Sequence, residues 1–212
     1  MYVESRPSEN ADGILGRTAS PMESNPAVVS TVFLDRDGVI NLKSPDGEYV
    51  TSWQQFQILP GVADAIRKMN DAGLRVLVVS NQRGIALGRC TRADVDLIHA
   101  QLQEFLCGEG CRIDRIYFCE HDYGMCDCRK PGIGMFRQAV ADFPSIQPES
   151  SVMIGDSLSD VDFARNAGIR VMLIRSADSP RVAMDRDANL PDATCNSLAE
   201  AADLVLKLAR KC

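Results

Sequence analysis

Five short runs rich in apolar residues, separated by stretches with helical spacing, limit this chain to few folds. Each run is short and largely apolar on both faces, which predicts a buried strand. Strands that alternate with helices form a parallel sheet with right-handed crossovers and helices on both faces. We therefore predict an α/β fold, a Rossmann-like parallel sheet sandwiched between helices. The predicted strands are Val28–Leu34, Leu74–Val79, Ile113–Phe118, Val152–Ile154 and Val171–Ile174.

The helices between these strands begin and end at recognisable signals. Thr91 with Asp94, and Ser197 with Glu200, have the spacing of capping boxes at helix starts. A further helix is predicted over Asp160–Ala167, where Gly168 would end it. Residues 176–196 show no periodicity and are predicted to be irregular.

Polar clusters follow the predicted strands where each strand ends. Asp35 and Asp37 come directly after the first strand. Residues two apart in a strand share a face, so both carboxylates can point to one place and suit Mg²⁺. Alone they would equally fit an acidic turn, because Asp-Gly is a common turn dipeptide. Ligands bind at the carboxyl edge of a parallel sheet, where we expect the other clusters to join them. These are Ser80-Asn81, Arg129-Lys130 and Asp156.

Together these groups suit the transfer of a phosphoryl group. Mg²⁺ would be held by Asp35, Asp156 and the backbone carbonyl of Asp37, and would screen the charge of the phosphate. Asp35 can then attack phosphorus and form an aspartyl phosphate. Asp37 can protonate the leaving alcohol and later activate water. Ser80 and Lys130 would hold the phosphate oxygens.

The same residues, in the same order, resemble the motifs of the haloacid dehalogenase superfamily of phosphatases. The motifs are Asp35-Arg36-Asp37-Gly38, Ser80-Asn81-Gln82, Lys130 and Gly155-Asp156-Ser157-Leu158-Ser159-Asp160. The resemblance covers about residues 28 to 208. It implies the roles given above, and implies that Asp160 orients Lys130 or a metal-bound water. Val39 stands where the family usually has Thr, which removes one hydroxyl near the nucleophile.

A second metal site is predicted in the loop 119–128, which gathers three cysteines and a histidine. A Cys₃His set suits a closed, tetrahedral, structural Zn²⁺, whereas the alternative is a group of free thiols. Bound zinc would fix this loop and so position Arg129 and Lys130, which follow it directly. The predicted ligands are Cys119, His121, Cys126 and Cys128.

The loop narrows the resemblance to a capless branch of the superfamily. This branch contains D-glycero-D-manno-heptose-1,7-bisphosphate 7-phosphatase and histidinol-phosphate phosphatase. The resemblance implies hydrolysis of the 7-phosphate of the heptose bisphosphate, with histidinol phosphate as the alternative substrate. A bisphosphate needs cations for its second phosphate. The predicted substrate-binding residues are Asn81, Arg83, Arg89 and Arg129.

Composition fits one soluble domain with a small metabolite as partner. The chain has 212 residues and a net charge of −6, which disfavours nucleic acid and anionic membranes as partners. Residues 1–27 have no apolar segment typical of a secretory signal and are predicted to be a flexible tail, before a single domain over 28–212. We expect a cytoplasmic monomer. There are two other hypotheses. The chain could be a zinc-bearing binding module whose phosphatase site is vestigial, or a nucleic-acid 3′-phosphatase.

Overall fold

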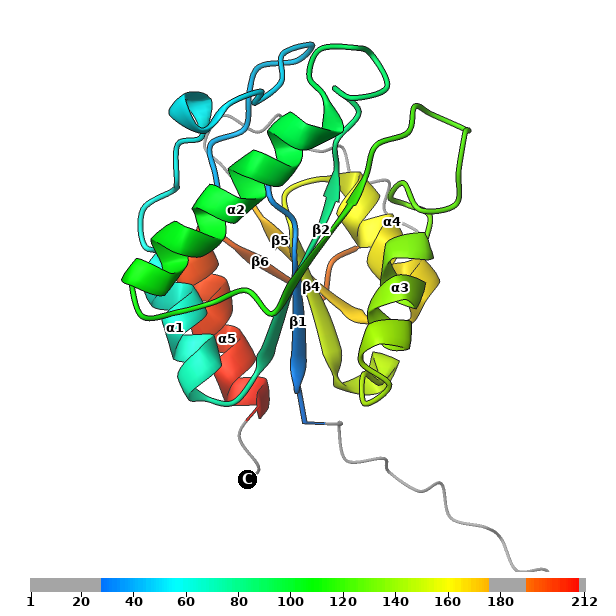
Figure 1. Cartoon of the computed structure of the whole chain (residues 1–212). Helices are drawn as coiled ribbons and strands as arrows, with labels where there is room; N and C mark the ends of the chain where they lie inside the picture. The colour runs from blue at the N-terminus through cyan, green and yellow to red at the C-terminus, as the bar shows by residue number, and fades with distance from the viewer. Residues whose placement is uncertain (1–27, 176–189, 210–212) are drawn as a thin grey trace, which may run out of the picture.

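The computed structural model describes residues 28–175 and 190–209. Within them an all-parallel sheet has the strand order β3-β2-β1-β4-β5-β6 (Figure 1). The strands are β1 (Thr31–Leu34), β2 (Arg75–Asn81), β3 (Arg115–Cys119), β4 (Ser151–Gly155), β5 (Arg170–Ile174) and β6 (Ala193–Cys195). The α-helices are α1 (Val62–Asp71), α2 (Arg92–Gly108), α3 (Gly134–Asp142), α4 (Leu158–Ala167) and α5 (Leu198–Ala209), and the short 3₁₀ helices are η1 (Trp53–Gln55) and η2 (Pro148–Ser150). The predicted parallel α/β fold is confirmed.

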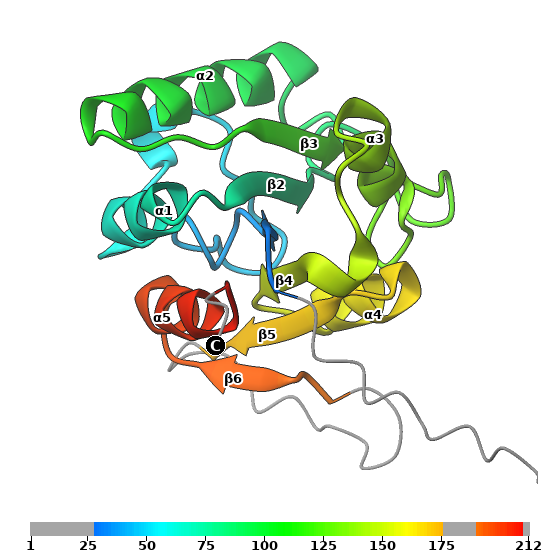
Figure 2. The same ribbon diagram turned by 90° about the horizontal axis from the view of Figure 1, so that it is seen from below.

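Helices cover both faces of the sheet. Figures 1 and 2 show α1, α2 and α5 on one face and α3 and α4 on the other. The central strand β1 supplies both layers, because its side chains alternate between the faces. Val32 and Leu34 pack in one buried apolar cluster and Phe33 in the second. A strand buried on both faces reads as a continuous apolar run, which is why the sequence identified it.

Local chemistry sets the starts of two helices. Thr91 and Asp94 form the predicted capping box of α2. Ser157 and Asp160 form another at the start of α4, so this helix begins at Leu158 and not at Asp160 as predicted. Asp160 occupies the third helical position, where its carboxylate accepts hydrogen bonds from the backbone amides of the preceding turn.

One strand escaped prediction. Ala193–Cys195 pairs in parallel with β5 at the edge of the sheet, inside the stretch predicted to be irregular. An edge strand this short offers no period for sequence reasoning to detect. The predicted flexible tail, residues 1–27, lies outside the described residues.

Two long connections lie at the carboxyl edge of the sheet, at the top of Figure 1. The first joins β1 to α1, and Trp53 stacks on Phe56 there with ring centroids 5.1 Å apart. Phe56 is buried in the core, which anchors this connection to the body. The second connection follows β3 and carries the cysteines. The described residues contain no separate cap domain, and none of their helices is long and apolar enough to cross a bilayer.

Candidate active site and metal centre

Two adjacent strands bring the key carboxylates together. Strands β1 and β4 pair in register, and the backbone amide of Asp35 donates to the carbonyl of Ile154 at 2.9 Å. One carboxylate oxygen each of Asp35, Asp156 and Asp160 lie within 4.8 Å of one another. Strand order reverses between β1 and β4, and such a switch point forms a ligand crevice in open parallel sheets. The geometry therefore allows these carboxylates to share one cation.

Gly38 makes room for this arrangement. Its φ is +91°, in the region that favours glycine, and a Cβ at this position would overlap the carboxylate of Asp156. A glycine at position 38 is thus required by packing as well as by turn geometry.

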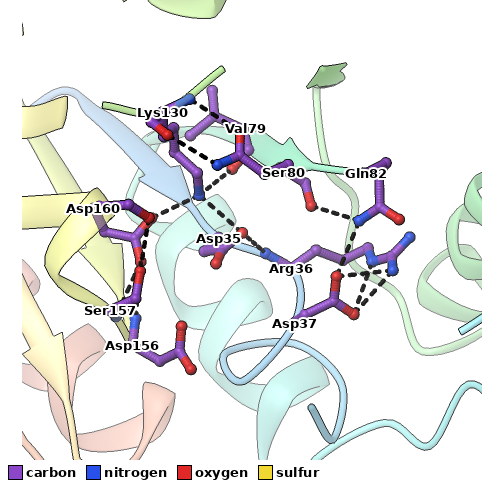
Figure 3. A network of polar contacts seen from close by, with 12 residues as sticks. Asp35, Arg36, Asp37, Val79, Ser80, Gln82, Lys130, Asp156, Ser157 and Asp160 are labelled. Carbon is purple, nitrogen blue, oxygen red and sulfur yellow. Dashed lines mark hydrogen bonds and ion pairs between the residues drawn. The ribbon is translucent and has the colours of Figure 1, made fainter. Parts of the chain in front are cut away.

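A buried lysine joins two of the carboxylates. The ammonium of Lys130 lies 2.9 Å from Oδ1 of Asp35 and 2.6 Å from Oδ1 of Asp160. It also donates to the carbonyl of Val79 at 2.8 Å (Figure 3). The side chain of Lys130 is 1% exposed and that of Asp160 is fully buried. These three acceptors match the three donors of the ammonium and fix its position beside Asp35.

The electrostatics of Asp35 reflect its burial. Loss of solvent raises the pKa of Asp35 to about 7, although the positive charge of Lys130 opposes the rise. Burial also raises the pKa of Asp156, against the charge of Lys43. When Asp35, Asp156 and Asp160 are all ionised, their three charges exceed those of Lys130 and Lys43, which favours a bound cation.

Asp37 lies in a different environment. Its carboxylate accepts hydrogen bonds from Arg36, Asn41 and Gln82, each at 2.9 Å. Burial alone would raise its pKa, but the charge of Arg36 and these hydrogen bonds leave the pKa below the ordinary value. Gln82 donates at 2.8 Å to the hydroxyl of Ser80 as well, which links the first and second motifs.

A cavity of about 430 Å³ opens over these groups. Its walls include the connection after β1, from Lys43 to Val50, and three arginines, Arg36, Arg83 and Arg129. Arg83 and Arg129 place their guanidinium carbons 4.3 and 4.4 Å from the ring centroid of Tyr123. Asp122 pairs with Arg83 at 2.5 Å. In contrast, Nε and Nη1 of Arg129 are buried without a hydrogen-bond partner among the described residues, so this cation is available for an anion.

The four predicted metal ligands of the second centre also meet. Their sulfur and nitrogen atoms lie within 4.8 Å of one another. Sγ of Cys126 is 3.5 Å from Sγ of Cys119 and 3.2 Å from Sγ of Cys128. Nδ1 of His121 is 3.6 Å from Cys119 and 3.4 Å from Cys128. A tetrahedral zinc site with Zn–S bonds of about 2.3 Å has edges of roughly 3.8 Å, so the donors fit a metal ion of this size.

Comparison with known proteins identifies the family to which this chain and its site belong. The family model described as HAD-hydrolase-like matches residues 127–201. The D-glycero-alpha-D-manno-heptose-1,7-bisphosphate 7-phosphatase of Mycobacterium tuberculosis is 41% identical over 136 residues, which cover 64% of this chain and 71% of that protein. The chain belongs to the haloacid dehalogenase superfamily. It is a phosphatase, a phosphoric monoester hydrolase.

Other relatives cover nearly the whole domain. The D-glycero-beta-D-manno-heptose-1,7-bisphosphate 7-phosphatase of Escherichia coli O6:H1 is 34% identical over 187 residues, which cover 84% of this chain and 95% of that protein. Among solved structures, the D,D-heptose 1,7-bisphosphate phosphatase of B. bronchiseptica, complexed with magnesium and phosphate, has a TM-score of 0.74 and 30% identity. The structural match covers 84% of this chain and 99% of the B. bronchiseptica chain.

Only some of the predicted substrate-binding residues of the phosphatase line the cavity. Arg83 and Arg129 line the cavity, whereas Arg89 is exposed and is not among its lining residues. Asn81 also lines the cavity, but its amide clamps the backbone of Lys130 through contacts of 2.9 and 3.1 Å. Its observed contacts therefore position Lys130.

Sequence reasoning missed several residues of the phosphatase site. Arg36 is 1% exposed, and its Nη1 lies 3.3 Å from Nε2 of His99 on α2. Burial and the charge of Arg36 lower the pKa of His99 to about 3, so its imidazole is neutral. Lys43, at 2.7 Å from Asp156, was also missed. The only sequence signal for Arg36 is its place between two aspartates, and no spacing signals the other two.

Proposed function

We propose that this phosphatase hydrolyses the 7-phosphate of D-glycero-D-manno-heptose 1,7-bisphosphate with Mg²⁺, through an aspartyl phosphate. The chemistry is supported by one observation above all: carboxylate oxygens of Asp35, Asp156 and Asp160 lie within 4.8 Å of one another, and the ammonium of Lys130 contacts two of these groups, Asp35 and Asp160. The substrate is supported by relatives that carry this activity in their names, at 34% and 41% identity.

The residues present fit a magnesium ion. Oδ1 of Asp156 is buried without a hydrogen-bond partner among the described residues. The missing Cβ of Gly38 leaves space beside that carboxylate. Asp35, Asp156 and the backbone carbonyl of Asp37 would hold Mg²⁺, as the sequence predicted. A bound Mg²⁺ would screen the charge of the phosphate and let a carboxylate approach phosphorus.

The side chains of the site have distinct roles in this proposal. A carboxylate oxygen of Asp35 forms a bond to phosphorus while the bond from phosphorus to the sugar oxygen breaks. The low pKa of Asp37 leaves it ionised in the empty site, so in this proposal it takes up a proton as the anionic substrate binds and then gives that proton to the sugar oxygen. Lys130 and Ser80 hold the equatorial oxygens as their charge redistributes. Asp37 then takes a proton from water, which attacks phosphorus, releases inorganic phosphate and restores Asp35.

The second phosphate has a candidate partner in Arg129. Two of its nitrogens are buried and unpartnered among the described residues, and a phosphate can satisfy two donors of one guanidinium. Histidinol phosphate carries an amine and an imidazole in place of a second phosphate. A cationic group would be repelled by Arg129 and Lys43, which both line the cavity, so we rank this substrate second.

We further propose that the cysteine cluster binds a structural Zn²⁺. Its support is the donor set of Cys119, His121, Cys126 and Cys128 and their separations of 3.2 to 3.6 Å. The backbone amide of Arg129 donates to Sγ of Cys126 at 3.4 Å. A metal on this sulfur would therefore also fix the start of the segment that carries Lys130.

Phosphate release from a panel of esters, with Mg²⁺ and with EDTA, tests the proposal. We expect the heptose bisphosphate to have a higher kcat/KM than histidinol phosphate. Asp35→Asn should abolish turnover, whereas Asp64→Asn, an exposed partner of Arg67 on α1, should retain it. Full activity of Asp35→Asn would refute the mechanism, and a preference for histidinol phosphate would refute the substrate.

A further inference from the structure

Lys43 lies on the carboxylate that the proposed magnesium site needs. It comes from the connection after β1, and its Nζ is 2.7 Å from Oδ2 of Asp156. The side chain of Asp156 is 6% exposed, but that of Lys43 is 52% exposed. A long, half-exposed side chain thus neutralises an almost fully buried carboxylate in the metal-free protein.

The two lysines of the site are held differently. Lys130 is buried and has three acceptors. The described residues give Lys43 a single hydrogen bond, to Asp156, and its other surroundings are solvent and the cavity that it lines. A lysine with one partner on a flexible four-carbon stem can move at little cost, whereas Lys130 cannot.

Mg²⁺ and Lys43 compete for the charge of one carboxylate: Lys43 holds Oδ2 of Asp156, and Oδ1 of the same group has no hydrogen-bond partner among the described residues. An ion bound to Asp156 would bring a double positive charge close to the ammonium, and like charges at such distances repel strongly where solvent is partly excluded. Repulsion between the two cations therefore favours movement of Lys43 away from Asp156 when Mg²⁺ binds. Once displaced, Lys43 still lies at the wall of the cavity, where an oxygen of a bound phosphate is a partner that an ammonium readily binds.

We propose that Lys43 is a movable positioning residue: it balances the charge of Asp156 in the metal-free enzyme, gives way to Mg²⁺, and then binds a phosphate oxygen in the cavity. This inference rests on the proposed Mg²⁺ site. Its consequence is a coupling between two ligands. Lys43 weakens the binding of Mg²⁺ alone and strengthens the binding of phosphate once Mg²⁺ is present.

Calorimetric titration at fixed ionic strength separates these effects. Lys43→Met should bind Mg²⁺ about fivefold more tightly than wild type, at the upper end for a partly exposed ion pair. With Mg²⁺ saturating, inorganic phosphate should bind about fivefold more weakly to the same variant. Lys43→Arg should bind Mg²⁺ and phosphate with affinities close to those of wild type, because it keeps the positive charge. Lys68→Met should match wild type, since Lys68 is 51% exposed and pairs with Asp203 on α5.

Two failures are distinguishable. If wild type binds no Mg²⁺, the proposed metal site and this inference are both overturned. If wild type binds Mg²⁺ and Lys43→Met binds it equally or more weakly, the role of Lys43 is overturned and the metal site stands. Equal phosphate affinity in Lys43→Met and wild type would also overturn the role of Lys43.

Discussion

Lys130 and Asp160 lie 30 positions apart in the chain, yet their charged atoms are 2.6 Å apart and their side chains are almost completely buried. Asp160 comes from the first turn of α4, where it also accepts hydrogen bonds at the helix start. The carboxylate of Asp160 therefore has two roles, one at the start of helix α4 and one in the active site. It fixes the ammonium that faces Asp35 and fixes the turn that carries Asp156.

Removal of Lys130 should cost much stability. Lys130→Met leaves the carboxylates of Asp35 and Asp160 buried without their cation, and breaking a buried pair costs about 3 kcal/mol or more. Urea unfolding in EDTA measures this loss. Lys68→Met removes an exposed lysine of α1 and should unfold at the same urea concentration as wild type. If both variants lose the same stability, the buried network is not what stabilises this edge of the sheet.

Gly38→Ala should prevent Mg²⁺ binding and abolish activity. Its methyl group would meet the carboxylate of Asp156 and displace it from Asp35. The left-handed backbone adds about 1 kcal/mol of strain. Gly73→Ala is the matched control, because Gly73 has φ +76° but nothing within 4 Å of its added Cβ. It should lose similar stability and keep Mg²⁺ binding by calorimetry. Normal Mg²⁺ affinity in Gly38→Ala would contradict the proposed geometry.

The fold could be predicted because its strands are buried on both faces. Such strands leave continuous apolar runs, and Val32, Phe33 and Leu34 are all fully buried. The four motifs could be found because each is local in the sequence and follows a strand or precedes a helix. The start of α4 was misplaced by two residues, since Ser157 caps it and Asp160 was taken as the first helical residue.

The remaining site residues could not be predicted because their contacts are distant in the sequence. Arg36 meets His99 over 63 positions, and Lys43 meets Asp156 over 113. No period or spacing encodes such pairs. Arg89 was predicted because a second phosphate needs cations and this arginine closely follows the second motif, but its backbone amide closes a turn onto Gly84 at 2.8 Å and its side chain is exposed. The direction in which a loop side chain points depends on tertiary contacts, which no local sequence pattern encodes.

Zinc should be present and should stabilise the loop after β3. We expect about one zinc ion per chain by elemental analysis. Cys126→Ser should lose the metal and lower the melting temperature, because the sulfur also accepts from the amide of Arg129. Cys107→Ser is the control, since Cys107 is an exposed free cysteine on α2 and should keep its zinc. A Cys126→Ser protein with full zinc content would refute the proposed ligand set.

Mg²⁺ binding should depend on pH through Asp35. Burial raises the pKa of Asp35 to about 7 in the metal-free protein, so the carboxyl is protonated below that pH. A metal ligand must be ionised. Each ion bound at about pH 6 should therefore release close to one proton, and the affinity should fall up to about tenfold per pH unit below 7. Calorimetry in two buffers with different ionisation enthalpies counts the proton.

The same shift predicts how stability responds to pH. The pKa of Asp35 is higher in the folded chain than in the unfolded chain, so the folded state binds the additional proton. This contribution to stability is present at low pH and is lost as the pH rises from about 4 to about 7. Urea unfolding in EDTA should show that loss, and saturating Mg²⁺ should reverse it, because the ion replaces the proton on the carboxylate. A metal-free protein whose Asp35-dependent stability stays constant over this range would show that Asp35 ionises normally, and the predicted proton release would then be absent.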